Sequence, residues 1–293
     1  MFPAPFDYRR ARTIDEAVDA LASHGDDARI LAGGQSLIPA MRFRLARPSV
    51  LVDINAIPEL DYVRETDGVL TIGATARDHA IEVSPLIASS YALIEGASRV
   101  VADPVVRQTG TVVGSLCHND PAGDWPVVAT ASNAQVVVRG KSGNRTIAID
   151  DFIVDSFTTA LAAGEMAVEV RFPAPGPRTS GSYQKIERKV GDFATACAAA
   201  TISLKPDGTI ASAGIAIGAL GPKALRVAQA EKLLAGQKPS KDLIVSAAAE
   251  AEKIADPTPD NRGSVAYKKA MAAVLVRRAI VEALERLGVG GMK

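Results

Sequence analysis

The chain has 293 residues, equal numbers of basic and acidic side chains (33 of each) and a hydrophobic fraction of 47%. This balance argues against a surface made for nucleic acid and against a polybasic membrane patch. The length fits about two domains, each able to bury a core. No apolar run could span a bilayer and the first residues lack a secretory hydrophobic segment, so we expect a cytoplasmic protein.

The cysteine and histidine content limits the metal chemistry that we expect. Two cysteines, Cys117 and Cys197, lie far apart in a chain with three histidines. Two thiolates cannot hold an iron–sulfur cluster, and no paired-ligand spacing predicts another metal site. We therefore expect redox chemistry in this chain to come from an organic cofactor.

Helical and extended patterns alternate in the first half of the chain. Thr13 and Glu16 form a capping box before apolar residues at helical spacing. Asp67-Gly68, between two extended runs, is a strong hairpin signal. In chain order we predict a helix at 13–24, strands at 29–32 and 50–54, a hairpin of 62–65 with 69–74, and helices from a cap at Thr75 and Asp78 to about 101.

A Pro-Ala-Pro-Gly-Pro run at 173–177 divides the second half, and we place a domain boundary there. Before it we predict a strand-like segment at 105–115, a helix at 125–132, a hairpin of 136–139 with 146–149, and a strand at 168–172. After it we predict strands at 183–188, 194–204 and 209–220, then helices at 224–235, 242–254 and 264–287. This succession indicates an α+β class.

The first candidate site directly follows the strand at 29–32 and has the sequence AGGQSL. Its two adjacent glycines, Gly33 and Gly34, allow close backbone approach and positive φ angles, so that successive N–H groups can point into one concavity. Such a concavity suits a pyrophosphate. A simple chain turn explains the glycines equally well when the segment is taken alone. The G-x-G-x-x-G fingerprint of an NAD-binding unit is absent.

The second candidate site begins at Arg107, in the segment RQTGTVVGSLCHNDPAGD. Its first part combines hydroxyl donors with glycines that permit close approach. The carboxylate at its end, Asp124, can accept hydrogen bonds from ribose hydroxyls or a ribityl chain. Its position just before the helix at 125–132 favours a capping role instead. We expect His118 and Cys117 to pack rather than react, because no partner base is in view.

Four segments in order carry a resemblance to a known family. AGGQSLIPAMRFRLARPSVLVDI comes first and TGTVVGSLCHNDPAGDWP second; GEMAVEVRFP and YQKIERKVGDFATA continue through the predicted domain boundary. Together they resemble the FAD-binding medium subunit of molybdenum hydroxylases. That group includes the carbon monoxide dehydrogenase flavoproteins and the flavin domain of xanthine dehydrogenase. The resemblance covers nearly the whole chain.

The resemblance implies a fold and a division into domains. Residues 1–176 would form the two-part FAD-binding fold of the vanillyl-alcohol oxidase (PCMH) type, with subdomains of about 1–57 and 58–176. Residues 177–293 would form the family's smaller C-terminal domain, a small antiparallel sheet with helices. The fold class is α+β throughout.

The resemblance also implies the cofactor-binding residues. They are Ala32, Gly33, Gly34, Gln35, Ser36, Leu37, Thr111, Gly114, Ser115, Asp124, Leu161, Lys185 and Phe193. The residues of the two loops would hold the FAD pyrophosphate, and Asp124 matches the family's FAD-binding aspartate. Leu161 and Lys185 fall where the family contacts the distal parts of the flavin, and Phe193 falls near the isoalloxazine. No catalytic residue and no metal ligand is implied in this chain.

One position departs from the family pattern. The family has two adjacent glycines in the second loop, whereas the first of them is Val113 here. A β-branched residue would be strained if that position required a positive φ. We therefore expect either a different course of this loop or a phosphate contact through Gly114 alone.

The function that the resemblance implies is electron transfer. In such complexes a large molybdopterin-binding subunit oxidises the substrate, and electrons pass through [2Fe–2S] clusters of a small subunit to FAD in the medium subunit. An external acceptor then takes them. We expect FAD in this chain, the other cofactors in partner subunits, and a dimer of heterotrimers, with contact to the inner face of the membrane left open. Carbon monoxide, an aldehyde, a purine or another heterocycle stay open as substrate, since that pocket would lie in another chain.

Two other functions remain open from the sequence. A self-sufficient FAD-dependent oxidoreductase of the same fold would need a substrate pocket with a proton donor beside the isoalloxazine. A nucleotide-binding or scaffolding subunit would keep the glycine loops and hold no flavin. Bound flavin excludes the second alternative, and turnover by the isolated chain would favour the first.

Overall fold

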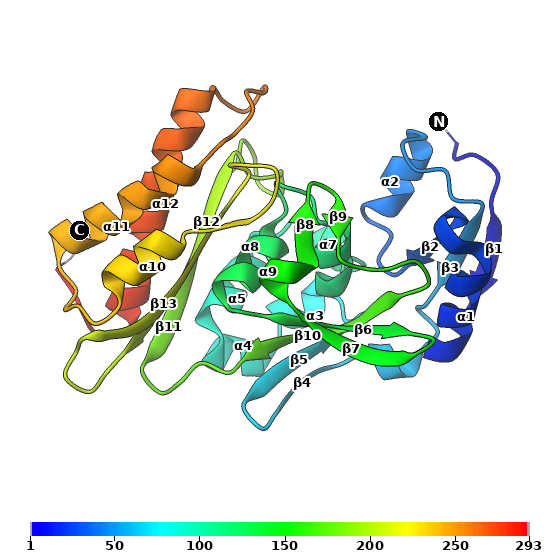
Figure 1. The fold of residues 1–293 in the computed structure, drawn as a ribbon, viewed down its shortest axis with the longest axis horizontal. Helices are drawn as coiled ribbons and strands as arrows, with labels where there is room; N and C mark the ends of the chain where they lie inside the picture. Colours follow the sequence, from blue (N-terminus) through cyan, green and yellow to red (C-terminus); the bar gives the residue numbers. More distant parts are fainter. Residues whose placement is uncertain (1, 292–293) are drawn as a thin grey trace.

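The structure is a computed structural model that describes residues 2–291. Three regions follow one another along the long axis of the molecule: a small N-terminal unit, a central unit of sheet and helices, and a C-terminal sheet covered by long helices (Figure 1). The class is α+β, as predicted. No helix among the described residues is long and apolar enough to cross a membrane.

The N-terminal unit is built on a parallel three-stranded sheet in the order β1–β3–β2. The strands are β1 (Asp7–Arg10), β2 (Ala28–Leu31) and β3 (Val50–Asp53), and α1 (Ile14–His24) joins the first two. Thr13 caps α1 as predicted, accepting a hydrogen bond from the backbone of Glu16. Because β2 and β3 are parallel, with Leu31 opposite Asp53, the segments that follow them leave at the same edge of the sheet. This edge carries the first glycine loop.

The central unit contains an antiparallel five-stranded sheet in the order β4–β5–β10–β6–β7. Its strands are β4 (Val63–Thr66), β5 (Val69–Gly73), β6 (Gln135–Gly140), β7 (Gly143–Ala148) and β10 (Met166–Pro173). Both predicted hairpins are confirmed. Asp67 and Gly68 have φ angles of 52° and 73°, the positive values that this two-residue turn requires.

Short helices complete the central unit. They are α3 (Asp78–Glu82), α4 (Pro85–Ser90), α5 (Ala92–Ser98), α6 (Pro104–Arg107), α7 (Val112–His118), α8 (Asp124–Ala131) and α9 (Ile149–Phe152). A two-stranded ribbon of β8 (Ile153–Asp155) and β9 (Thr158–Thr159) lies beside them. A 3-10 turn, Pro58–Leu60, precedes β4, and another, Gly25–Asp27, follows α1.

Two predictions for this helical layer are wrong. The segment at 105–115 is helical rather than extended, because Asp103 and Thr111 cap α6 and α7 and override the β propensity of the valines. Thr75 and Asp78 do not cap a helix. Instead α3 begins at Asp78 without a side-chain cap, and the Asp78 carboxylate accepts a hydrogen bond from Trp125.

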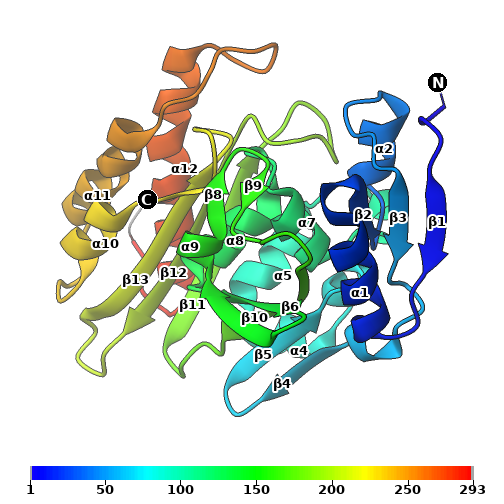
Figure 2. The ribbon, with the colours of Figure 1, turned by 45° about the vertical axis from the view of Figure 1, so that its right-hand side comes forward.

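The C-terminal region is an antiparallel sheet of β11 (Thr179–Ile186), β12 (Ala196–Leu204), β13 (Ile210–Gly218) and β14 (Leu225–Arg226). Its helices α10 (Ala228–Leu234), α11 (Lys241–Ile254) and α12 (Val265–Arg286) cover one face, while α5 and α8 pack on the other (Figure 2). Alternate residues of β12 therefore enter two different cores, Cys197 and Ala199 one, and Ala196 and Ala198 the other.

The predicted C-terminal elements are confirmed in type and order but not in all their bounds. The first strand begins earlier than predicted, at Thr179. The helix predicted from 224 begins at Ala228, because Leu225 and Arg226 pair with β13 as an edge strand.

Candidate functional site

The first loop, residues 32–37, leaves the carboxyl end of β2 and leads into α2 (Leu37–Arg42). Gly34 has a φ of 73°, which favours glycine. Within residues 2–291, the backbone N–H groups of residues 33–36 donate no hydrogen bond. A run of unpaired donors in a partly exposed turn is available to an anionic ligand.

Residues 111–115 of the second loop form the first turn of α7, with Thr111 as its N-cap. The Thr111 hydroxyl accepts a hydrogen bond from the Gly114 N–H at 3.1 Å, and the Ser115 N–H donates to the Thr111 carbonyl at 3.0 Å. Val113 is buried within this turn and its φ is not positive. The strain that we considered for a valine at this position is absent, because the position is helical.

The two loops contact each other directly. A Cβ atom added at Gly33 would lie 2.2 Å from the Thr109 carbonyl oxygen and 3.0 Å from the Gly110 Cα. The Gln35 side chain donates a hydrogen bond to the Thr109 hydroxyl across the same contact. Gly33 is therefore required for the approach of the second loop, in addition to any ligand contact.

Asp124 lies in a buried polar cluster with residues from the C-terminal sheet. Its carboxylate accepts hydrogen bonds from the Tyr183 hydroxyl at 2.6 Å and from the Lys185 ammonium at 3.1 Å. Lys185 also donates to the Val100 carbonyl at 3.0 Å and lies 3.3 Å from the Glu187 carboxylate. The capping role that its spacing suggested is wrong: α8 has Gly123 at its N-cap and no side-chain cap.

Burial dominates the electrostatics of this cluster. It raises the pKa of Asp124, and the positive charge of Lys185 opposes that rise. Burial likewise raises the pKa of Tyr183 well above its usual value, so its hydroxyl stays protonated and donates to Asp124. The structure thus brings together Asp124 and Lys185, two predicted residues that lie far apart in the sequence.

Asp78 connects this cluster to the second loop. Its N–H donates to the Gly110 carbonyl at 2.9 Å, and its carboxylate accepts from the Trp125 indole at 3.0 Å. A Cβ at Gly110 would lie 2.5 Å from the same carboxylate. Burial raises the pKa of Asp78 to about 7, against the Trp125 hydrogen bond, which lowers it. The sequence pattern predicted a helix cap at Asp78 and not this buried role, because its partners Gly110 and Trp125 are distant in the chain.

The remaining predicted residues lie on two connections. Leu161 follows β9 and packs partly buried against the core. Phe193 lies on the connection between β11 and β12, which projects from the end of the sheet in Figure 2. Phe193 is 47% exposed. The Asp192 carboxylate holds this connection by accepting from the Phe193 N–H.

His118 and Cys117 pack as predicted. The His118 ring lies against Phe157, with 5.2 Å between ring centroids, and burial lowers its pKa. Burial raises the pKa of the Cys117 thiol to about 12, so it is not an activated nucleophile. Among residues 2–291, no group of three or more potential metal-ligating side chains is assembled.

Two family models and several relatives match the chain. The FAD binding domain in molybdopterin dehydrogenase matches residues 4–175, and the CO dehydrogenase flavoprotein C-terminal domain matches residues 181–283. The chain belongs to the FAD-binding medium subunits of the molybdenum hydroxylases. It is an oxidoreductase subunit with FAD as its cofactor.

The similarity to individual members covers the whole chain. The carbon monoxide dehydrogenase medium chain of Hydrogenophaga pseudoflava is 38% identical, with 98% of this chain and 99% of the relative covered. The 6-hydroxypseudooxynicotine dehydrogenase complex subunit alpha of Paenarthrobacter nicotinovorans is 36% identical, with coverage of 98% and 97%. A solved structure of the Hydrogenophaga pseudoflava carbon monoxide dehydrogenase gives a TM-score of 0.95 at 39% identity, covering 98% and 99%.

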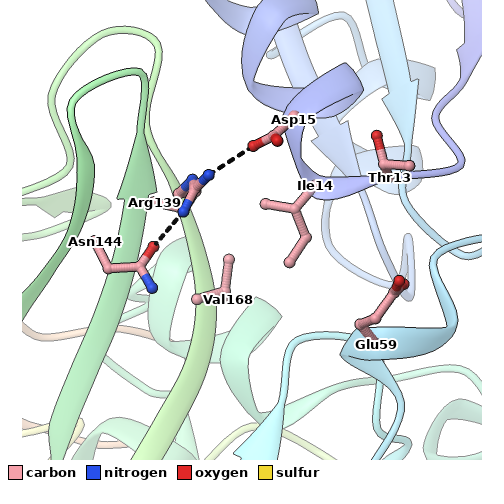
Figure 3. A pocket seen from close by; sticks show the side chains of 7 residues that line it. All are labelled: Thr13, Ile14, Asp15, Glu59, Arg139, Asn144 and Val168. Atoms are coloured by element: carbon pink, nitrogen blue, oxygen red, sulfur yellow. Dashed lines mark hydrogen bonds and ion pairs between the residues drawn. The ribbon is translucent and has the colours of Figure 1, made fainter.

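A hollow elsewhere on the molecule contains none of the predicted site residues. It has a volume of about 270 Å³ and lies between α1 and the β6–β7 hairpin (Figure 3). Its lining residues are Thr13, Ile14, Asp15, Glu59, Arg139, Asn144 and Val168. Arg139 crosses it, donating to Asp15 at 2.7 Å and to Asn144 at 3.3 Å. The hollow is a polar junction between the N-terminal and central units.

The residues of the glycine loops fit FAD. The unpaired N–H groups of residues 33–36 match a pyrophosphate, and a side chain at Gly34 would be strained by the backbone conformation there. Lys185 places a positive charge 3.1 Å from the Asp124 carboxylate. When bound, FAD supplies the electron-carrying chemistry that the side chains lack.

Proposed function

We propose that this chain is the FAD-carrying electron-transfer subunit of a molybdenum-containing hydroxylase or dehydrogenase. Electrons would arrive from [2Fe–2S] clusters of a small partner subunit, which a large molybdopterin-binding subunit reduces while it oxidises the substrate. They would leave through FAD to an external acceptor. The observation that carries the proposal is the row of unpaired N–H groups at residues 33–36, held against the second loop in a member of this family.

The proposal assigns a role to each part of the site. The FAD pyrophosphate binds the first loop, Ala32 to Leu37, with the exposed side of the α7 turn at Gly114 and Ser115 completing the cradle. Thr111 acts by shaping that turn. Asp124 and Lys185 face the sugar and the distal polar atoms, while Leu161 and Phe193 flank the flavin. In this arrangement the chain binds, orients and shields the cofactor.

We further propose the arrangement of the chain and its assembly. The FAD-binding domain comprises residues 1–176, with subdomains of about 1–57 and 58–176, and the C-terminal domain comprises 177–293. Two heterotrimers, each with a large and a small subunit, form a cytoplasmic dimer. The change from central to C-terminal sheet between β10 and β11 supports the boundary.

Purification of the chain with its co-expressed partner subunits tests this function. We expect FAD, molybdenum and iron in a fixed ratio, a flavin absorption spectrum, and flavin reduction that follows reduction of the iron–sulfur clusters. Gly34→Val should remove FAD while leaving the iron content unchanged. A complex that contains no FAD, or one whose Gly34→Val variant keeps its full flavin content, would contradict the proposal.

A further inference from the structure

Two side chains outside the loops, Asn55 and Arg77, link the loops through a chain of hydrogen bonds. The Asn55 Nδ2 donates to the Ala32 carbonyl at 2.9 Å, and its Oδ1 accepts from the Arg77 guanidinium at 2.6 Å. The other arm of Arg77 donates to the Thr109 carbonyl at 2.8 Å. The oxygen of that carbonyl lies 2.2 Å from the position that a Cβ atom at residue 33 would take. Asn55 and Arg77 therefore bridge Ala32, at the start of the first loop, to Thr109 of the second loop.

Each member of the bridge is fixed by its own element. Asn55 follows β3, and both its N–H and its Nδ2 donate to the Asp53 carboxylate, at 2.8 Å and 2.7 Å. Arg77 precedes α3 and forms a β-bridge with Thr111, the residue that caps α7. The bridge thus joins the edge of the parallel sheet to the turn of the second loop.

Arg77 also brings charge to the loops. Both side-chain partners are neutral oxygens, and within residues 2–291 it forms no ion pair with a carboxylate. Its positive charge is therefore available to an anion bound at the loops. A lysine at this position would keep the charge, but a single ammonium does not reproduce the planar two-armed guanidinium.

We propose that Arg77 and Asn55 are positioning residues for the cofactor: their bridge holds the two loops at the separation that the FAD pyrophosphate requires. This inference rests on the proposed binding of the pyrophosphate at residues 33–36. The bridge acts on the pyrophosphate half of FAD and leaves the isoalloxazine half to Phe193 and the Asp124 cluster.

The test measures FAD and riboflavin binding to the full chain in its complex, after removal of flavin. Arg77→Lys and Asn55→Ala should each raise the Kd for FAD about tenfold, the effect of losing one or two hydrogen bonds to a charged or preorganised group. Riboflavin lacks the pyrophosphate, so its Kd should stay unchanged. Arg139→Met is the matched control, since Arg139 also crosses from the N-terminal to the central unit.

Three results would overturn the inference. An Arg77→Lys variant with the parent's FAD affinity would show that charge alone matters. An equal rise in the Kd values for FAD and riboflavin would show a general loss of structure. An equal rise in the Kd for FAD in Arg139→Met would show that loss of any contact between the N-terminal and central units weakens binding. Gly34→Val separates these results from failure of the proposed site: if that variant loses FAD while Arg77→Lys and Asn55→Ala do not, only the bridge is refuted.

Discussion

The two glycine-bearing loops look alike in sequence and differ in what their backbones do. In the first loop, the N–H groups of residues 33–36 have no partner within the described chain. In the second, the N–H groups of Gly114 and Ser115 are already bound to Thr111 and form the start of α7. Backbone donors for an anion are therefore unused in the first loop, whereas those of Gly114 and Ser115 are taken up by the helix turn.

The comparison also separates two reasons for glycine. Gly34 needs a positive φ, and Gly33 needs the absence of a Cβ because a carbonyl lies where that atom would be. A Cβ at Gly114 would instead meet a side chain, the Thr111 hydroxyl at 2.5 Å, which would have to move from its capping position. We expect substitutions to be more severe at Gly33, where the obstructing atom belongs to the backbone, than at Gly114.

The largest effect is expected from Gly33→Ala. The added methyl group would meet the Thr109 carbonyl at 2.2 Å, so the loops must separate. We expect the complex to purify without FAD and its Kd to rise by about 100-fold or more. The flavin-to-protein absorbance ratio measures this. Gly96→Ala is the control, because its nearest neighbour lies at 3.9 Å; a Gly33→Ala complex with full flavin content would remove the distinction between the loops.

The next effect concerns Asp78, which is hydrogen-bonded to Gly110 of the second loop and to Trp125. Its pKa is raised to about 7 from 3.8, so the folded state binds a proton more tightly between these values. Its contribution to stability is complete below pH 3.8 and is lost as the pH rises through 7. Relative to Asp78→Asn, the parent should lose stability with a slope of about 1.4 kcal/mol per pH unit between pH 5 and 6, and about half that slope near pH 7. Urea unfolding of both proteins at several pH values tests this; parallel pH profiles would contradict it.

Val113→Gly, which restores the family pattern, should reduce stability and leave binding unchanged. The valine is buried in the first turn of α7, and glycine there loses apolar burial and helix propensity. We expect a cost of about 2 kcal/mol in unfolding free energy. The Kd for FAD should change by less than about twofold, because the position carries no strain to relieve. A clear gain in affinity would show that the valine impairs the second loop.

The smallest effect is expected at Thr111. Thr111→Ala removes the α7 cap and should cost about 1 kcal/mol of stability. FAD affinity should fall by no more than a few fold, since the hydroxyl is already engaged with Gly114. Thr111→Ser keeps the cap and should restore both quantities. If Thr111→Ser loses as much stability and FAD affinity as Thr111→Ala, the Thr111 hydroxyl is not responsible for either quantity.

Local signals decided the elements that were predicted well. The Thr13 cap, the Asp67-Gly68 hairpin and the long C-terminal helices each depend on contacts within a few residues, and each is confirmed. The strand prediction for 105–115 is wrong because strand propensity and helix caps compete there. The caps begin both helices, and Val112 and Val113 are buried in α7 while Val105 is exposed on α6.

Local patterns in the sequence predict the fold class, the order of most elements and the first glycine loop, because periodicity, caps and turn residues act locally. The sequence motifs also show the resemblance to the family. The structure was needed to show that Lys185 donates to Asp124, that the Thr109 carbonyl lies against Gly33, and that Asn55 and Arg77 bridge the loops. These contacts join residues that are distant in the chain, and their geometry depends on how the sheets and helices pack, which no local pattern records.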